Sequence, residues 1–130
     1  MPVDKSRTVF IVDDNDLSRH LLRGILRDSP LEIAGETTTG ENAVEIVAKL
    51  RPDIVFLDII LPGMDGIAVL RALKEQHPGI IVLMITSEPR GNVVREAIAY
   101  GADGLLVKPF NAARVLESVA HAIAQQAVSA

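Results

Sequence analysis

Several kinds of residue are rare or missing in this chain. It has no cysteine and no tryptophan, and aromatic residues make up only 3% of its 130 residues. Without cysteine, neither a disulfide framework nor a thiolate metal site can form. No apolar run approaches the roughly 20 residues of a membrane-spanning helix, and residues 1–7 lack the apolar core of a signal peptide. With a net charge of −4, the domain is not expected to bind nucleic acid electrostatically. We therefore expect a cytoplasmic protein with no membrane contact.

Aliphatic side chains, by contrast, are abundant. Hydrophobic residues make up 48% of the sequence, and almost all of them are aliphatic. This length and composition predict a single α/β domain over residues 1–130, with its core at about residues 7–123.

Five short apolar runs alternate with amphipathic segments. Each run is too short for a surface helix and rich in strand-forming residues, which is typical of strands buried in a sheet. The expected strands are residues 7–12, 31–36, 54–57, 80–85 and 105–107. Strands that alternate with helices form a parallel sheet covered on both faces, so we predict a doubly wound α/β fold with five strands and five helices.

The segments between the strands have the features of helices. Residues placed to cap them are Asn15 or Asp16, Thr39, Asp65 and Asn111. In the first helix, the apolar residues that recur at four-residue spacing are Leu17, Leu21 and Ile25, and Leu22 and Leu26. Arg19, Arg23 and Arg27 form a second stripe, which we interpret as a solvated face. The last helix carries apolar residues up to Ile123, and the tail 124–130 gives no structural signal.

The third expected strand ends on a carboxylate. Asp58 follows the apolar run 54–57, and three more apolar residues and the turn signal Pro62-Gly63 come after it. An ionised carboxylate among apolar neighbours is costly unless something satisfies it. We expect a metal ion and a nearby lysine to do so, and we expect Asp58 to accept a phosphoryl group.

Other strand ends supply matching groups. Asp13 and Asp14 follow the first strand, Thr86 ends the fourth and Lys108 follows the fifth. The carboxyl ends of parallel strands share one edge of the sheet, where such folds place their functional crevice. Each residue alone has an ordinary explanation, as a helix cap, a strand end or a solvated lysine. Together they indicate one kind of chemistry contributed by four strands.

Three neighbouring carboxylates call for a cation. At an effective dielectric constant of 20, two such charges repel by roughly 4 kcal/mol, so without a cation one of them would tend to hold a proton. An all-oxygen ligand set without histidine or cysteine suits Mg²⁺ or Mn²⁺. The ion leaves positions for phosphoryl oxygens, and in-line attack by Asp58 on phosphorus yields an aspartyl phosphate.

These residues resemble the landmarks of a known family. The residues that carry the resemblance are Asp13-Asp14, the segment from Asp58 to Gly66, Thr86 and Lys108-Pro109-Phe110. In this order they look like the receiver domain of bacterial two-component response regulators. The resemblance covers about residues 7–123 and implies a flavodoxin-like fold with strand order 2-1-3-4-5.

The resemblance implies roles for the acidic residues. Asp58 would accept a phosphoryl group from a histidine kinase or phosphotransfer protein. Asp14, Asp58 and the backbone carbonyl of Ile60 would bind Mg²⁺ directly, and Asp13 would act largely through metal-bound water. Such a domain is a phosphoacceptor that assists its own phosphorylation and dephosphorylation, and is not an enzyme in the usual sense.

The resemblance also implies a switch. Thr86 and Lys108 would move to the phosphoryl oxygens, with the Lys108–Pro109 bond in the cis form. The added charge of about −1.5 to −2 would then shift the surface formed by the fourth strand, the helix after it, the fifth strand and the last helix. The expected partner is a downstream protein or an output domain outside this chain, and a homodimer of the phosphorylated form is a further option.

Two positions depart from the commonest family pattern. Leu105 stands where many receivers have an aromatic residue, which excludes an aromatic rotamer switch there. Ile60, two residues after the expected phosphoacceptor, and Glu88, two after Thr86, flank the path of attacking water in the family. Because the Ile60 side chain offers water no hydrogen bond, we expect it to influence the lifetime of the phosphoryl group.

Three other functions share parts of this residue pattern. A haloacid-dehalogenase-type hydrolase needs a second aspartate two residues after the nucleophile, where Ile60 stands. A flavodoxin-like flavin site needs a phosphate-binding loop after the first strand, where two aspartates would repel the phosphate, and no Gly-rich nucleotide motif follows any strand. A receiver that binds partners without phosphorylation stays open, although the full set of site residues is present.

Overall fold

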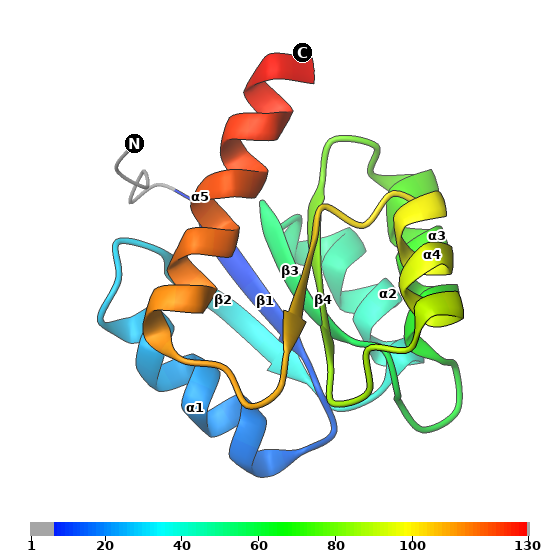
Figure 1. The fold of residues 1–130 in the computed structure, drawn as a ribbon, viewed down its shortest axis with the longest axis horizontal. Coiled ribbons are helices and arrows are strands. Elements are labelled where there is room, and N and C mark those ends of the chain that lie inside the picture. The colour runs from blue at the N-terminus through cyan, green and yellow to red at the C-terminus, as the bar shows by residue number, and fades with distance from the viewer. Residues whose placement is uncertain (1–6, 130) are drawn as a thin grey trace.

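The computed structural model describes residues 7–129 and contains five strands and five helices in alternation (Figure 1). The strands are β1 (Thr8–Val12), β2 (Glu32–Thr37), β3 (Ile54–Asp58), β4 (Ile81–Thr86) and β5 (Gly104–Val107). The helices are α1 (Asp16–Arg27), α2 (Gly40–Leu50), α3 (Gly66–Gln76), α4 (Gly91–Ala99) and α5 (Ala112–Ser129). All strand pairs are parallel, in the order β2-β1-β3-β4-β5, so the predicted doubly wound fold is confirmed.

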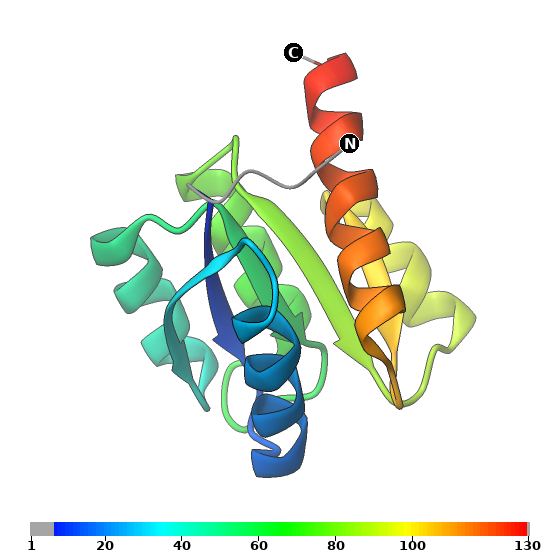
Figure 2. The same cartoon turned by 90° about the vertical axis from the view of Figure 1, so that its left-hand side faces the viewer.

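The sheet separates two apolar layers because neighbouring residues of a strand point to opposite faces. In β3, Ile54 and Phe56 pack with residues of α1 and α5, whereas Val55 and Leu57 pack with residues of α2, α3 and α4. Figures 1 and 2 show the same division, with α1 and α5 on one face of the sheet and α2, α3 and α4 on the other. All five residues of β3 are buried, so this central strand carries Asp58 into an environment with little water.

The capping residues begin the helices as the sequence predicts. Their side-chain oxygens accept hydrogen bonds from backbone N–H groups in the first turn. The pairs are Asn15 with Ser18 (2.9 Å), Thr39 with Asn42 (3.3 Å), Asp65 with Ala68 (2.9 Å) and Asn111 with Arg114 (2.9 Å). The cap at Asp65 matters most for the site, because it starts α3 directly after the loop that follows Asp58.

The two leucine rows of α1 differ in their surroundings. Leu22 and Leu26 are fully buried, whereas Leu17 is 77% exposed and Leu21 is 43% exposed. Successive residues of a helix are about 100° apart around its axis, so the row that contains Leu21 and the row that contains Leu22 face different directions. The row of Leu22 and Leu26 faces the sheet, whereas in the other row Ile25 is partly buried against the same core. The four-residue spacing alone does not show which row is the more buried.

Helix α5 is longer than the sequence analysis indicates. It continues through residues 124–129, which carry no apolar stripe but contain no helix-breaking residue either. The side chain of Gln126 donates a hydrogen bond to the carbonyl oxygen of Gly79, at 2.5 Å, in the connection before β4. Residues 124–129, for which the sequence gives no structural signal, therefore form the end of the helix.

Candidate functional site

The candidate site residues lie at one edge of the sheet. Asp58 is the last residue of β3 and Thr86 the last of β4, while Asp13 and Lys108 come directly after β1 and β5. Because all strands are parallel, these positions share the carboxyl edge of the sheet, at the bottom of the view in Figure 1. Strand order reverses direction here between β1 and β3, where doubly wound sheets place their functional crevice.

Three carboxylates form an acidic cluster at this edge. Asp13, Asp14 and Asp58 each offer one carboxylate oxygen, and the three atoms lie within 4.8 Å of one another. Asp13 is fully buried and Asp58 is 5% exposed, while Asp14 is exposed to solvent. Two of the three acids are therefore buried and one is exposed. The sequence predicts the proximity of the three acids, but not this difference in burial.

Asp58 is held through both of its carboxylate oxygens. Oδ1 accepts a hydrogen bond from the backbone N–H of Ile60 at 2.9 Å, and Oδ2 accepts one from Lys108 Nζ at 2.7 Å. Burial alone would lower the pKa of Lys108, but the hydrogen bond and the charge of Asp58 outweigh burial and raise that pKa. Lys108 is therefore a permanent cation beside the carboxylate at neutral pH. The Lys108–Pro109 peptide is cis, as the resemblance implies.

Asp13 is less well satisfied than Asp58. Its Oδ1 accepts a hydrogen bond from the backbone N–H of Asn15 at 2.9 Å. Its Oδ2 lies 3.2 Å from Lys108 Nζ but has no hydrogen bond, although it is buried. Burial raises the pKa of Asp13 from 3.8 to about 6. The hydrogen bond from Asn15 lowers this pKa and the nearby charge of Asp58 raises it, but both effects are smaller than that of burial. A buried carboxylate oxygen without a donor is a group that a cation would satisfy.

Thr86 lies at the edge but is not bonded to the acids in this structure. It is 2% exposed, and its Oγ1 accepts a hydrogen bond from the backbone N–H of Glu88 at 3.0 Å. Ile60 is 61% exposed, and its apolar side chain offers the acidic cluster no hydrogen bond. Leu105 is half-buried and packs against the apolar layer of α2, α3 and α4. The structure thus brings Asp13, Asp58 and Lys108 into contact and leaves Thr86 beside them.

Two residues that support the site cannot be recognised from the sequence. The spacing of Arg19 in the arginine stripe predicts a solvated side chain, but this side chain is only 13% exposed and donates to the backbone carbonyl of Asp13 at 2.8 Å. Glu41 of α2 accepts a hydrogen bond from the backbone N–H of Met64 at 3.0 Å, which holds the loop after β3. Neither contact has a sequence signal, because the first depends on how α1 docks on the sheet and the second joins residues that are 23 positions apart in the chain.

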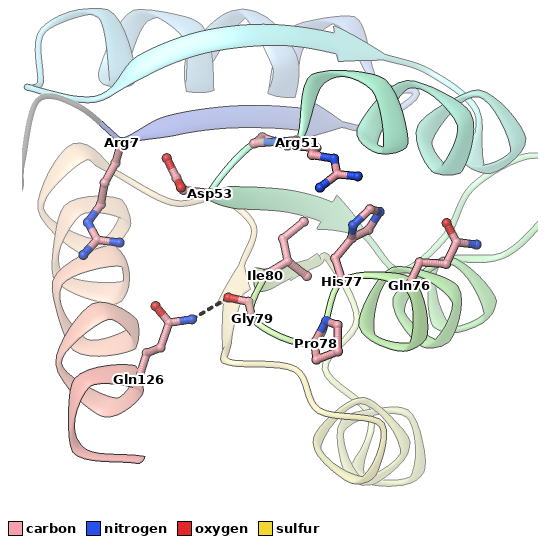
Figure 3. Close-up of a pocket in the computed structure, with 10 residues that line it drawn as sticks. Arg7, Arg51, Asp53, Gln76, His77, Pro78, Gly79, Ile80 and Gln126 are labelled. Carbon is pink, nitrogen blue, oxygen red and sulfur yellow. Dashed lines mark hydrogen bonds between the residues drawn. The ribbon is translucent and has the colours of Figure 1, made fainter. Parts of the chain in front are cut away.

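A separate hollow of about 380 Å³ lies at the opposite edge of the sheet, as Figure 3 shows. Its one carboxylate, Asp53, accepts hydrogen bonds from the backbone N–H and the hydroxyl of Thr8, at 2.8 and 3.4 Å. Gln126 on its far wall donates to Gly79 (Figure 3). No cluster of carboxylates is among the residues that line this hollow, so the acidic cluster at the carboxyl edge is the candidate functional site.

The chain is similar to known proteins over most of its length. The family "Response regulator receiver domain" matches residues 9–120. Protein CcdB of Bacillus subtilis is 41% identical over 111 residues, which are 85% of this chain and 92% of that protein. Chemotaxis protein CheY of Halobacterium salinarum is 37% identical over 114 residues, which are 88% of this chain and 94% of that protein.

A solved structure agrees with these matches. The CheX–CheY–BeF₃–Mg²⁺ complex of Borrelia burgdorferi has a chain with a TM-score of 0.83 and 33% identity, covering 87% of this chain and 86% of its own. Among the described helices, none is long and apolar enough to cross a membrane. The family match, the fold and the acidic edge of the sheet agree, and the chain belongs to the receiver domains of response regulators, the CheY-like proteins of two-component signalling.

Proposed function

We propose that Asp58 is the phosphoacceptor of a Mg²⁺-dependent receiver that takes its phosphoryl group from a histidine kinase or phosphotransfer protein. One observation carries this proposal. Asp58 stands at the end of the central strand with Lys108 Nζ at 2.7 Å and with two further carboxylates whose oxygens lie within 4.8 Å. A buried nucleophile, a fixed cation and a divalent-metal ligand set at one point are what phosphoryl transfer requires.

The donor groups fit a divalent cation. The cluster offers only oxygen ligands, it includes a buried oxygen of Asp13 without a hydrogen-bond donor, and no histidine or cysteine belongs to it. We assign Asp14, Asp58 and the carbonyl of Ile60 as direct ligands, with Asp13 acting largely through water, and Mn²⁺ could replace Mg²⁺. When bound, the ion neutralises charge that develops on the transferring phosphoryl group. The relative from Borrelia burgdorferi, whose complex contains BeF₃ and Mg²⁺, supports this assignment.

The chain's own residues carry out the remaining work. A carboxylate oxygen of Asp58 attacks the phosphorus of a phosphohistidine, an O–P bond forms, and the P–N bond breaks with its electron pair returning to the imidazole, which takes a proton from solvent. Lys108 already contacts the attacking carboxylate, so its ammonium lies ready to bind a phosphoryl oxygen. Thr86 would have to exchange its bond to the N–H of Glu88 for a bond to the phosphoryl group.

The movement of Thr86 would connect phosphorylation of Asp58 to a change at the protein surface. Thr86 ends β4 and Lys108 follows β5, so both residues would pull on the same edge of the sheet when they bind the phosphoryl group. We propose that the surface of β4, α4, β5 and α5 changes and is read by a downstream protein or an output domain. This surface has exposed apolar side chains in Ile98, Tyr100 and Val107. Because Leu105 replaces the usual aromatic residue, the change would proceed without an aromatic rotamer.

Mass spectrometry tests the proposal directly. The protein is mixed with Mg²⁺ and acetyl phosphate, and its intact mass is recorded beside that of Asp58→Asn. We expect the native chain to gain one phosphoryl group, the variant to gain none, and a chelator to block the gain. Beryllofluoride binding is measured in parallel, because it mimics the phosphoryl group without a donor. A chain that neither gains mass nor binds beryllofluoride with Mg²⁺ would contradict the proposal and favour a receiver that only binds partners.

A further inference from the structure

Arg19 connects three segments at the edge of the sheet that carries the acids. Its side chain is 13% exposed, and its guanidinium donates to three acceptors. These are the backbone carbonyl of Asp13 at 2.8 Å, Glu36 Oε1 at 3.1 Å and a carboxylate oxygen of Asp16. One residue of α1 thus holds the end of β1, the end of β2 and the first turn of its own helix together. A guanidinium presents its donors in a fixed planar fork, so it can fix the relative positions of several acceptors.

The contact with Asp13 is the one that matters for metal binding. The carbonyl of Asp13 belongs to the peptide that joins Asp13 to Asp14, and that peptide is planar. Fixing the direction of this carbonyl therefore also fixes the N–H and Cα of Asp14. Asp14 is exposed and shows no side-chain hydrogen bond among the described residues, so its backbone is the means by which the chain can aim its carboxylate at the cluster.

We infer that Arg19 is a positioning residue for the metal site, acting through the Asp13–Asp14 peptide to keep the Asp14 carboxylate within reach of the ion held by Asp58. The inference rests on the proposed function, because it concerns the same Mg²⁺ site. It assigns Arg19 no contact with the ion or with the phosphoryl group. Groups that orient metal ligands from outside the ligand set typically change metal affinity 10- to 100-fold when removed.

A role of Arg19 through its charge and a role through positioning Asp14 predict opposite changes in Mg²⁺ affinity when Arg19 is replaced. Arg19 is a cation close to an acidic cluster, so a role through charge alone would disfavour a second cation. Removing Arg19 would then leave Asp16 and Glu36 unneutralised and would tighten Mg²⁺ binding. A positioning role predicts weaker binding in spite of the more negative surroundings. The direction of the change therefore decides between the two.

The measurement is a Mg²⁺ titration of the full chain followed by NMR. The backbone amide signals of Asn15 and Ile60 are suitable probes, because these amides donate to Asp13 and Asp58. We expect Arg19→Gln to raise the Mg²⁺ dissociation constant by about tenfold or more. Arg19→Lys keeps the charge, but one ammonium does not reproduce the hydrogen bonds of the guanidinium to Asp13, Asp16 and Glu36, so we expect a smaller loss of Mg²⁺ affinity than in Arg19→Gln. If Arg19→Gln does not fold, Arg19→Lys alone still tests the inference.

Two matched variants separate position from charge and from stability. Arg23→Gln removes the same charge one turn further along α1, where Arg23 pairs with Glu36 at 3.4 Å and, among the described residues, shows no hydrogen bond to Asp13. Lys74→Gln breaks a half-buried bridge to Asp103, 2.7 Å long, at the start of β4, far from the acids. Both should bind Mg²⁺ like the parent chain, even though Lys74→Gln lowers the free energy of unfolding.

The outcomes distinguish this inference from the proposed function. Mg²⁺ binding that is unchanged or tighter in Arg19→Gln, or equally weakened in Arg23→Gln, would overturn the positioning role and leave the Asp58 receiver intact. A parent chain that binds no Mg²⁺ would overturn the proposed function, and the inference with it. Weaker binding in both Arg19 variants together with normal binding in both controls supports the inference.

Discussion

At the scale of single residues, the buried carboxylate of Asp13 makes the stability of the metal-free protein depend on pH. Burial raises its pKa from 3.8 to about 6, so the folded chain binds this proton more tightly than the unfolded chain does. The contribution of this group to stability is therefore greatest below pH 3.8, and it decreases as the pH rises to about 6.

Asp13→Asn should remove the loss of stability that ionisation of Asp13 causes as the pH rises. In the presence of a chelator, we expect the variant to exceed the parent chain in free energy of unfolding by about 1–3 kcal/mol at about pH 8, and by little at about pH 4. Urea unfolding at both pH values measures the difference. Excess Mg²⁺ should stabilise the parent chain more than the variant, and a variant that is less stable than the parent at about pH 8 without metal would contradict the argument.

Ile60 is the residue whose effect on the phosphoryl group can be tested most simply. Its backbone N–H holds Asp58, but its side chain is 61% exposed and apolar, so it offers attacking water no hydrogen bond. We expect Ile60→Asn to shorten the lifetime of phosphorylated Asp58 several-fold, because an amide can orient water near the phosphorus. The decay of the phosphorylated mass measures this lifetime. Ile60→Val keeps an apolar side chain and serves as the control, and equal lifetimes in all three proteins would refute the prediction.

At the scale of secondary-structure elements, α3 begins so close to the end of β3 that its first residue must be glycine. A Cβ on Gly66 would lie 2.3 Å from the carbonyl oxygen of Asp58 and 2.5 Å from the Cα of Ile59. These are backbone atoms, so relief requires moving the strand end that carries the phosphoacceptor. The close approach of helix and strand is therefore part of what positions Asp58.

Gly66→Ala should destabilise the domain by about 1–3 kcal/mol and slow the phosphorylation of Asp58. Gly24→Ala is the matched control, since Gly24 lies in α1 with nothing within 4 Å of the added Cβ. Alanine is a better helix former, so this variant should be about 0.5–1 kcal/mol more stable than the parent. Denaturant unfolding and acetyl phosphate labelling of the two variants provide the comparison, and equal behaviour of both would disprove the packing argument.

The sequence predicted the elements better than it predicted which of their faces are buried. Apolar runs locate buried strands because a strand covered on both faces leaves few polar positions, and side-chain caps mark helix starts because unpaired N–H groups need acceptors. The exposure of Leu17 could not be predicted, because it depends on which of two adjacent rows meets the sheet. The continuation of α5 past Ile123 leaves no mark in the apolar spacing, and helix propensity alone indicates it.

At the scale of the whole molecule, the parallel topology explains why the candidate site could be predicted. Residues at the ends of parallel strands must meet at one edge, so Asp13, Asp58 and Lys108 come together once the strands are correctly assigned. The role of Arg19 could not be predicted in this way. Its reach from α1 to the Asp13 carbonyl and to Glu36 depends on how the helix docks on the sheet, which side-chain spacing in the sequence does not specify.

The same topology separates the site from the end of α5. We propose that residues 7–123 are sufficient for a single cooperative domain. The side-chain hydrogen bond that the structure records for residues 124–129 joins Gln126 to Gly79, at the edge opposite the acids, and no residue from 124 to 128 is fully buried. A chain that ends at Ile123 should then unfold in one transition, with a free energy of unfolding lower by about 1 kcal/mol, and should accept a phosphoryl group at the parent rate. Gln126→Ala in the full chain isolates the hydrogen bond and should account for most of the loss. A broad or two-step transition in the shortened chain would show instead that the helix end belongs to the core, and slower phosphorylation would show that the two edges of the sheet are coupled.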